Sequence, residues 1–215
     1  MRIHYVNGFK IRQFLDPDFN VLETSQAGAL SFGSKWYIPN GEWWCDERFA
    51  DEAPFLLAVE RALWADATPS FALLRKKIIR RFTVPGPIPW FITKRSRHQQ
   101  KQIISVDGSI VRRHIDPQFV MGGHDLVYPY IPKNEIWIDA KLDPREIPHV
   151  LAHESLERDL MSKGKSYDVA HDWATAAEKE SRRAAGGAYL GDDNFPKKYK
   201  NLKTFIADIH VRTNK

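Results

Sequence analysis

Two histidines and two glutamates lie close together in the sequence, with a spacing that fits one helix. Residues 144–161 begin with proline and are soon followed by glycine, which is the usual punctuation of a helix. On that helix His153 and Glu157 fall among the apolar residues. His149 and Glu154 fall at the borders of the same face. Because ionisable side chains on a core face cost free energy unless they are paired or bind a metal, the segment predicts either a metal or catalytic site or a buried polar network.

A second helix is expected over residues 166–181. A serine stands at its N-cap, and alanines recur on one face, which permits close approach of a partner helix. The helix places His171 and Glu178 two turns apart along the edge of the alanine face, with Tyr167 beside them. It therefore supplies further polar side chains of the kinds that bind metals or carry protons.

The two helices are expected to form an antiparallel hairpin that turns at Gly164. Glu157 and His171 are each seven residues from that turn, so they should face each other. His153 should lie one turn deeper. The hairpin would thus gather side chains from both helices into one cluster.

The motif His153-Glu154-x-x-Glu157 resembles the zincin helix His-Glu-x-x-His, with Glu157 where that family has its second histidine. In zincins the histidines bind zinc, and the glutamate between them is the general base that activates metal-bound water. The resemblance implies Zn²⁺ held by His153, Glu157 and His171, with Glu154 as the catalytic base. His149, Tyr167, Glu178 and His124 are the residues expected to support this site or to replace a ligand.

The second half of the chain also has a wider likeness. Its pattern runs from Gly-Gly-His through Tyr-Ile-Pro-x-x-Glu-x-Trp-x-Asp to the two helical motifs, and it resembles uncharacterised phage and bacterial proteins without an assigned activity. For His124, in the Gly-Gly-His turn, one interpretation is a surface turn. The other is that His124 approaches the helical site, if the preceding strands pack on the helical hairpin.

The elements that would position these residues occur twice in the sequence. Residues 6–19 match residues 106–119 at a shift of 100, and residues 37–46 match residues 130–139 at a shift of 93. A third match, at a shift of 97, aligns residues 59–64 with 156–161. The chain therefore contains an internal duplication.

The first copy serves as an internal control for the site. At a shift of 97 it has Leu56 and Leu57 opposite His153 and Glu154, and it keeps Glu60 opposite Glu157. At a shift of 96 it has Arg75 opposite His171. The first copy could hold a Glu60–Arg75 ion pair, so the cluster either fastens each helical hairpin or carries chemistry in the second copy alone.

Each copy is predicted to fold in the same way. Asn7-Gly8 and Asp107-Gly108 stand between short runs rich in β-branched and aromatic residues, which predicts β-hairpins closed by type I′ turns. Further short strands and two helices follow. The expected fold is α+β, with two tandem duplicated modules, each of β-hairpins followed by an α-helical hairpin. The predicted boundaries are 1–85 for the first, degenerate module, 86–100 for a basic proline-rich linker, 101–186 for the second module with the candidate site, and 187–215 for a basic C-terminal tail.

The net charge of +5 is unevenly distributed. Residues 194–215 carry +5, and residues 75–105 carry +9 with no acidic residue, which leaves −9 on the rest of the chain. Basic connectors of this kind pack on an acidic body, keep a chain soluble, or neutralise phosphates of a nucleic acid. The basic residues of the central segment are Arg75, Lys76, Lys77, Arg80, Arg81, Lys94, Arg95, Arg97 and Lys101.

Several classes of protein are excluded or disfavoured. The single cysteine, Cys45, excludes an internal disulfide framework and a metal site made of cysteines alone. We find no P-loop, no dinucleotide fingerprint and no Gly-x-Ser-x-Gly elbow. Without a long apolar run or a signal peptide, we expect a cytoplasmic or virion-associated protein that is neither secreted nor bound to a membrane.

Two functions from different classes follow. The first is a zinc-dependent hydrolase or peptidase-like protein with Zn²⁺ as its cofactor and its site in the second module. The alternative is a non-enzymatic structural or interaction protein, such as a phage or virion component. In that case the basic linker and tail would contact a nucleic acid, a protein partner or a second copy of the chain.

Overall fold

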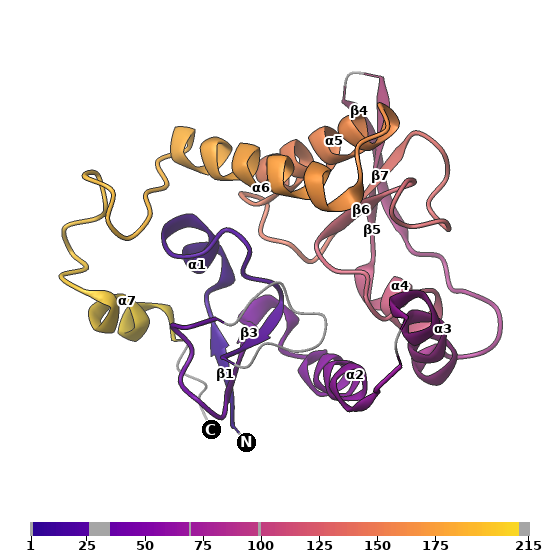
Figure 1. Ribbon diagram of the computed structural model, residues 1–215, viewed down its shortest axis with the longest axis horizontal. Coiled ribbons are helices and arrows are strands. Elements are labelled where there is room, and N and C mark those ends of the chain that lie inside the picture. The colour runs from indigo at the N-terminus through magenta and orange to yellow at the C-terminus, as the bar shows by residue number, and fades with distance from the viewer. Residues whose placement is uncertain (1, 26–34, 69, 99, 211–215) are drawn as a thin grey trace.

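The computed structural model of the protein describes residues 2–25, 35–68, 70–98 and 100–210, and within them the chain has an α+β fold in two modules (Figure 1). Module one contains β1 (Arg2–Val6), α1 (Gly8–Phe14), β2 (Leu22–Thr24), β3 (Glu42–Asp46), the 3-10 turn η1 (Glu47–Phe49), α2 (Ala53–Ala65) and α3 (Phe71–Phe82). Module two contains β4 (Ile92–His98), β5 (Lys101–Val106), α4 (Gly108–His114), β6 (Gly122–His124), β7 (Glu135–Asp139), α5 (Ile147–Ser162) and α6 (Tyr167–Ala184). Helix α7 (Leu202–Ile209) follows.

The two sheets share one topology. In module one the strand order is β1-β3-β2, with β1 parallel to β3 and β2 antiparallel to it. In module two the strands β5, β7 and β6 repeat this arrangement, and β4 is added as an antiparallel edge strand beside β5. The shared topology supports the duplication seen in the sequence, and the expected two-module α+β architecture is confirmed.

The expected hairpins at Asn7-Gly8 and Asp107-Gly108 are wrong. Each pair begins a helix instead: the Asn7 side chain accepts a hydrogen bond from Lys10 N at 2.9 Å, and the Asp107 side chain accepts one from Ser109 N at 3.0 Å. The physical reason lies in the sheets. The strand before each helix pairs in parallel with a later strand, and parallel neighbours need a crossover connection, which a two-residue turn cannot provide.

Each module contributes one fully buried arginine that binds an aspartate of its own sheet and a glutamate of the other module. Arg12 of α1 contacts Asp46 and Glu146, each at 2.7 Å. The corresponding contacts in module two are those of Arg112 with Asp139 at 2.7 Å and with Glu52 at 2.8 Å. Because buried charges destabilise a protein unless they are fully paired, these reciprocal contacts fix how the modules lie against each other.

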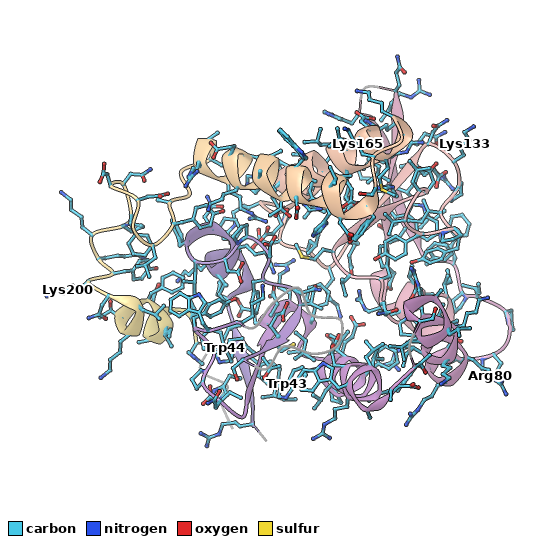
Figure 2. All side chains as sticks on the ribbon, in the orientation of Figure 1. Trp43, Trp44, Arg80, Lys133, Lys165 and Lys200 are labelled. Atoms are coloured by element: carbon cyan, nitrogen blue, oxygen red, sulfur yellow. The ribbon has the colours of Figure 1, made fainter. Side chains whose placement is uncertain are left out.

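The modules also share a hydrophobic core. One apolar cluster combines Trp43 and Leu56 of module one with Ile138 and Val150 of module two. Trp44, the neighbour of Trp43 in β3, points to the opposite face, as alternate residues of a strand do. It packs in a separate cluster with side chains of α7 (both tryptophans are labelled in Figure 2).

Parts of the expected linker and tail are built into the fold. Residues 92–98, within the expected linker, form β4. In the expected tail, Phe205 and Ile209 of α7 are buried against module one (Figure 1). Asn7 N donates to Ile209 O at 2.8 Å, just as Asp107 N donates to Phe91 O at 2.7 Å in module two, so the end of α7 occupies the place that the start of β4 occupies on the other sheet. Residues 211–215 lie outside the described part.

Within the described ranges, none of the helices is both long enough and apolar enough to span a bilayer.

Candidate metal centre

Helices α5 and α6 form the antiparallel hairpin that the sequence predicts (Figure 1). The turn depends on Gly164, whose φ of 87° lies in the left-handed region that glycine adopts without strain. Lys165 N donates to Leu160 O at 3.1 Å and Gly164 N donates to Met161 O at 2.9 Å, which closes the end of α5. The short turn brings the polar faces of the two helices together.

Glu157 is the centre of the polar cluster, and three histidines surround its carboxylate. The Oε1 atom lies 3.0 Å from His124 Nε2, and the Oε2 atom lies 2.9 Å from His171 Nδ1 and 3.5 Å from His153 Nε2. The Glu157 side chain is only 4% exposed. Burial by itself would raise the pKa of Glu157, but the hydrogen bonds from the histidines outweigh burial and lower the pKa well below its ordinary value.

His153 is held on its other side by Glu178 of α6. Its Nδ1 atom lies 3.0 Å from Glu178 Oε2. Burial lowers the pKa of His153, but the hydrogen bonds to Glu157 and Glu178 outweigh burial and raise the pKa to about 10. Arg182 binds Glu178 at 2.6 Å and Glu146 at 2.6 Å, and Glu146 also binds Arg12. An unbroken chain of buried charges therefore runs from His153 to module one.

His124 comes from β6 and is fully buried, so the interpretation as a surface turn is wrong. The reason is that β6 pairs with β7 and carries His124 under α5. The backbone N–H of Leu126 donates to His124 Nδ1 at 3.2 Å. Nδ1 is then an acceptor, so a neutral His124 carries its proton on Nε2 and donates it to Glu157 Oε1. His124 therefore orients Glu157, and its Nε2 atom has no lone pair to offer a metal.

Among the residues that the structure describes, two groups of side chains have ligand atoms within 4.8 Å of one another. One is His153, Glu157 and His171, and the other is His124, Glu154 and Glu157. The first fits a metal better, because the protonated Nε2 of His124 excludes the second. Ligand atoms about 2.0–2.1 Å from a tetrahedral zinc ion are about 3.3 Å apart, and the distances of 2.9 Å and 3.5 Å from Glu157 Oε2 to the two histidines lie on either side of that value.

Glu154 is half-buried on the same turn of α5. Its carboxylate belongs to the group with His124 and Glu157, so it lies next to the predicted ligands without being one of them. Burial raises the pKa of Glu154 to about 7. A carboxyl group of this kind can accept and release a proton near neutral pH.

The remaining predicted residues divide into two sets. Tyr167 stacks on His171 with ring centroids 5.3 Å apart, and Glu178 holds His153, so both lie at the cluster. His149 does not join it: its Nδ1 atom contacts Ser181 Oγ at 2.8 Å, and burial lowers its pKa. Sequence reasoning missed Arg182, although its position four residues after Glu178 on a buried helix face was a usable signal.

The cluster is more exposed on its α6 side than on its α5 side. The His171 side chain is 24% exposed, compared with 12% for His153. A surface hollow of about 290 Å³ is lined by Asp172, Trp173 and Ala176 of the same helix, none of which belongs to the cluster. A larger hollow of about 370 Å³ lies elsewhere, against α3. The accessible edge of the cluster is therefore the His171 edge.

Module one aligns with this site in a different register from the one expected. Glu52 and Glu146 stand at equivalent places, because each precedes its helix and binds the buried arginine of the other module. They are 94 residues apart, so the shift of 97 between α2 and α5 is wrong by almost one helical turn. At the shift of 94, Glu60 stands opposite Glu154.

In this register module one has an apolar core where module two has its charged cluster. Val59 and Leu63 stand opposite His153 and Glu157, and both are buried with Leu74 and Ile78 of α3. Thr24 takes the place of His124 at the end of β2. Helices α2 and α3 of module one thus meet through apolar side chains and without the charged cluster, over a smaller contact than that between α5 and α6.

The suggested Glu60–Arg75 ion pair does not form. Arg75 instead binds Asp116 of module two. Glu60 has a pKa that burial raises to about 7. The position of Arg75 opposite His171 stands, since Ser70 and Ser166 precede the two helices at the same shift of 96.

The basic residues of the central segment are separated by the fold. Lys101 at the start of β5 binds Asp159 at 2.9 Å, and Arg75 is engaged by Asp116. The others lie on α3 or on β4.

Comparisons with protein families, curated proteins and solved structures gave no match for this chain.

Proposed function

We propose that module two binds Zn²⁺ through His153, Glu157 and His171 and catalyses hydrolysis there. The observation that carries the proposal is the hydrogen bond between His153 Nδ1 and Glu178 Oε2. Histidines that bind metals usually donate their second ring N–H to a carboxylate, which fixes the tautomer and aims the other nitrogen at the ion. Here that other nitrogen, Nε2, faces Glu157 and His171.

The comparison between the modules favours a functional role over a purely structural one. The helical hairpin of module one is packed by Val59 and Leu63 at the places of His153 and Glu157. Replacing buried charged groups by packed apolar residues is often neutral or stabilising. Module one therefore joins its two helices without a charged cluster, and we infer that a ligand-binding role accounts for the cluster in module two.

The chain's residues divide the work of hydrolysis among them. When bound, the ion would act as a Lewis acid and activate water for attack. Glu154, whose pKa burial raises to about 7, would serve as the general base. His124 holds Oε1 of Glu157 so that Oε2 is left for binding. His153 gives up its Nε2 proton on binding, so affinity for the ion rises with pH.

The experiment is reconstitution of purified full-length protein with zinc, followed by dialysis and metal analysis. We expect one ion per chain, lost with the substitutions H153A, E157Q and H171A. H149A is the matched control, because His149 is a buried histidine of the same helix that contacts Ser181 instead. E154Q should keep the ion and lose hydrolysis of a panel of peptide and ester substrates.

Two results would overturn the proposal. Absence of stoichiometric metal in the reconstituted protein, with a melting temperature unchanged by EDTA or zinc, would identify the cluster as a buried network. Equal metal content in H153A and in the wild type would show that any bound ion sits elsewhere.

A further inference from the structure

Strand β4 is unusual because neither of its faces is covered. From Thr93 to His98 every residue is exposed, whereas alternate residues of a strand in a packed sheet are normally buried. Its partner β5 is covered on both faces, because the adjacent residues Ile103 and Ile104 are buried in different apolar clusters. β4 is also the edge of its sheet, so one side of its backbone is available to solvent. It is thus an exposed ribbon at the edge of module two (Figure 1).

The ribbon carries a concentrated positive charge. Lys94, Arg95 and Arg97 lie on it, and residues 75–105 contain no acidic side chain. Glu135, 3.9 Å from Arg95, is the only acidic ion-pair partner that the described part of the chain provides to these three residues. Arg95 itself remains 54% exposed.

An exposed aromatic side chain stands at the start of the ribbon. Trp90 is 77% exposed, the most of any large apolar residue among those the structure describes. It lies four residues before Lys94, about 13 Å away in an extended chain. An exposed indole ring offers a flat apolar surface that a second ring can cover by stacking. The ribbon therefore combines cations with an uncovered flat ring.

We infer that β4 and Trp90 bind single-stranded nucleic acid. Cations along a strand neutralise successive phosphates, and an exposed indole ring provides a surface on which an unpaired base can stack. A duplex offers phosphates but keeps its bases stacked inside, so it would leave Trp90 unused. An acidic protein surface would complement the positive charge of β4, but it would offer the Trp90 ring no base for stacking.

Lysine and arginine on an edge strand also prevent strand-to-strand aggregation. For this role a negatively charged side chain serves as well as a positively charged one. Charge reversal therefore separates the two explanations. The substitutions K94E, R95E and R97E keep the edge charged, so protection is preserved, whereas binding to phosphates is lost.

The test uses the full chain and a fluorescently labelled oligothymidylate of about 20 nucleotides, with anisotropy measured between about 50 and 200 mM salt. We expect the triple variant K94E/R95E/R97E to bind weakly. The slope of log affinity against log salt should become smaller by about 2, because each of three lost phosphate contacts contributes about 0.7 to it. W90A should lose about 5- to 150-fold in affinity with the salt slope unchanged. The matched control is K197E/K200E/K203E, which changes the net charge equally at exposed lysines of the C-terminal region and should bind like the wild type.

Four outcomes would overturn the inference. One is no binding of the oligonucleotide at the lowest salt. Another is equal loss in the control variant, which would mean that only net charge matters. The third is tighter binding to the corresponding duplex with no effect of W90A. The fourth is salt-resistant binding to an acidic polypeptide in place of the oligonucleotide. Circular dichroism of each variant distinguishes lost binding from lost folding.

Discussion

His124 donates a hydrogen bond from Nε2 to Oε1 of Glu157 at 3.0 Å, and this contact decides which oxygen of Glu157 is left for a ligand. The backbone N–H of Leu126 fixes the tautomer of His124 that makes this donation possible. The two residues come from different layers of module two, a strand and a helix. The sheet thereby orients a carboxylate that belongs to the helical hairpin.

From this relationship we predict that H124A weakens zinc binding without removing a ligand. Loss of a residue that orients a metal ligand typically reduces affinity about 10- to 100-fold. H124Q should restore part of the affinity, because the glutamine amide can donate the same hydrogen bond. Competition with a chromogenic chelator gives the dissociation constants. If H124A binds zinc as tightly as the wild type, His124 does not orient Glu157.

The raised pKa of His153 predicts how stability changes with pH in the metal-free protein. Its folded-state pKa of about 10 lies above the unfolded value of 6.5, so its contribution is complete below pH 6.5 and is lost as the pH rises through 10. Urea unfolding in EDTA should show the wild type losing stability relative to H153Q across this range. With zinc bound the loss should disappear, because the ring is already deprotonated. A constant difference between the two proteins from pH 6 to 10 would contradict the shift.

The sequence was informative where structure depends on local spacing. The helical period placed His153, Glu157 and His171 on facing surfaces, and Gly164 marked the turn between the helices, because these patterns extend over a few turns of chain. The structure brings these three side chains together. Their supporting contacts with Arg182 and Glu146 connect distant segments, which no local pattern reveals.

The sequence was misleading where one motif serves two structures. Asn7-Gly8 satisfies both a type I′ turn and a helix N-cap, and the choice is made by the parallel pairing of β1 with β3, about 40 residues later. The register of the helical match failed for a similar reason. Amino-acid similarity aligned Glu60 with Glu157. The true register follows from the start of each helix, where a glutamate binds an arginine of the other module.

Glu60 gives a prediction that does not depend on metal. Burial raises its folded-state pKa to about 7 from an ordinary 4.5, so the folded protein binds more protons than the unfolded chain between these values. Glu60 therefore destabilises the protein increasingly as the pH rises from 4.5 to 7. E60Q should be more stable than the wild type at pH 8 and similar at pH 4.5, as measured by chemical unfolding. A difference in stability between E60Q and the wild type that stays the same from pH 4.5 to pH 8 would contradict the raised pKa of Glu60.

Glu52 and Glu146 provide a matched pair of substitutions, because they occupy equivalent places and each binds the buried arginine of the other module. Removing one partner of a buried ion pair costs about 3–5 kcal/mol, so E52Q and E146Q should both lower the free energy of unfolding. Only Glu146 also binds Arg182, which binds Glu178 and through it His153. E146Q alone should therefore weaken zinc binding, by loosening the carboxylate that aims His153.

The pair separates the two roles because stability and affinity are measured on the same proteins. Unfolding in urea gives the loss of stability, and zinc competition below the onset of unfolding gives the affinity. A decrease in zinc affinity that is equal in E52Q and E146Q would mean that general destabilisation causes it. If E146Q loses stability but binds zinc normally, Glu178 is held in place without Arg182, and the chain of buried charges joins the modules without supporting the site.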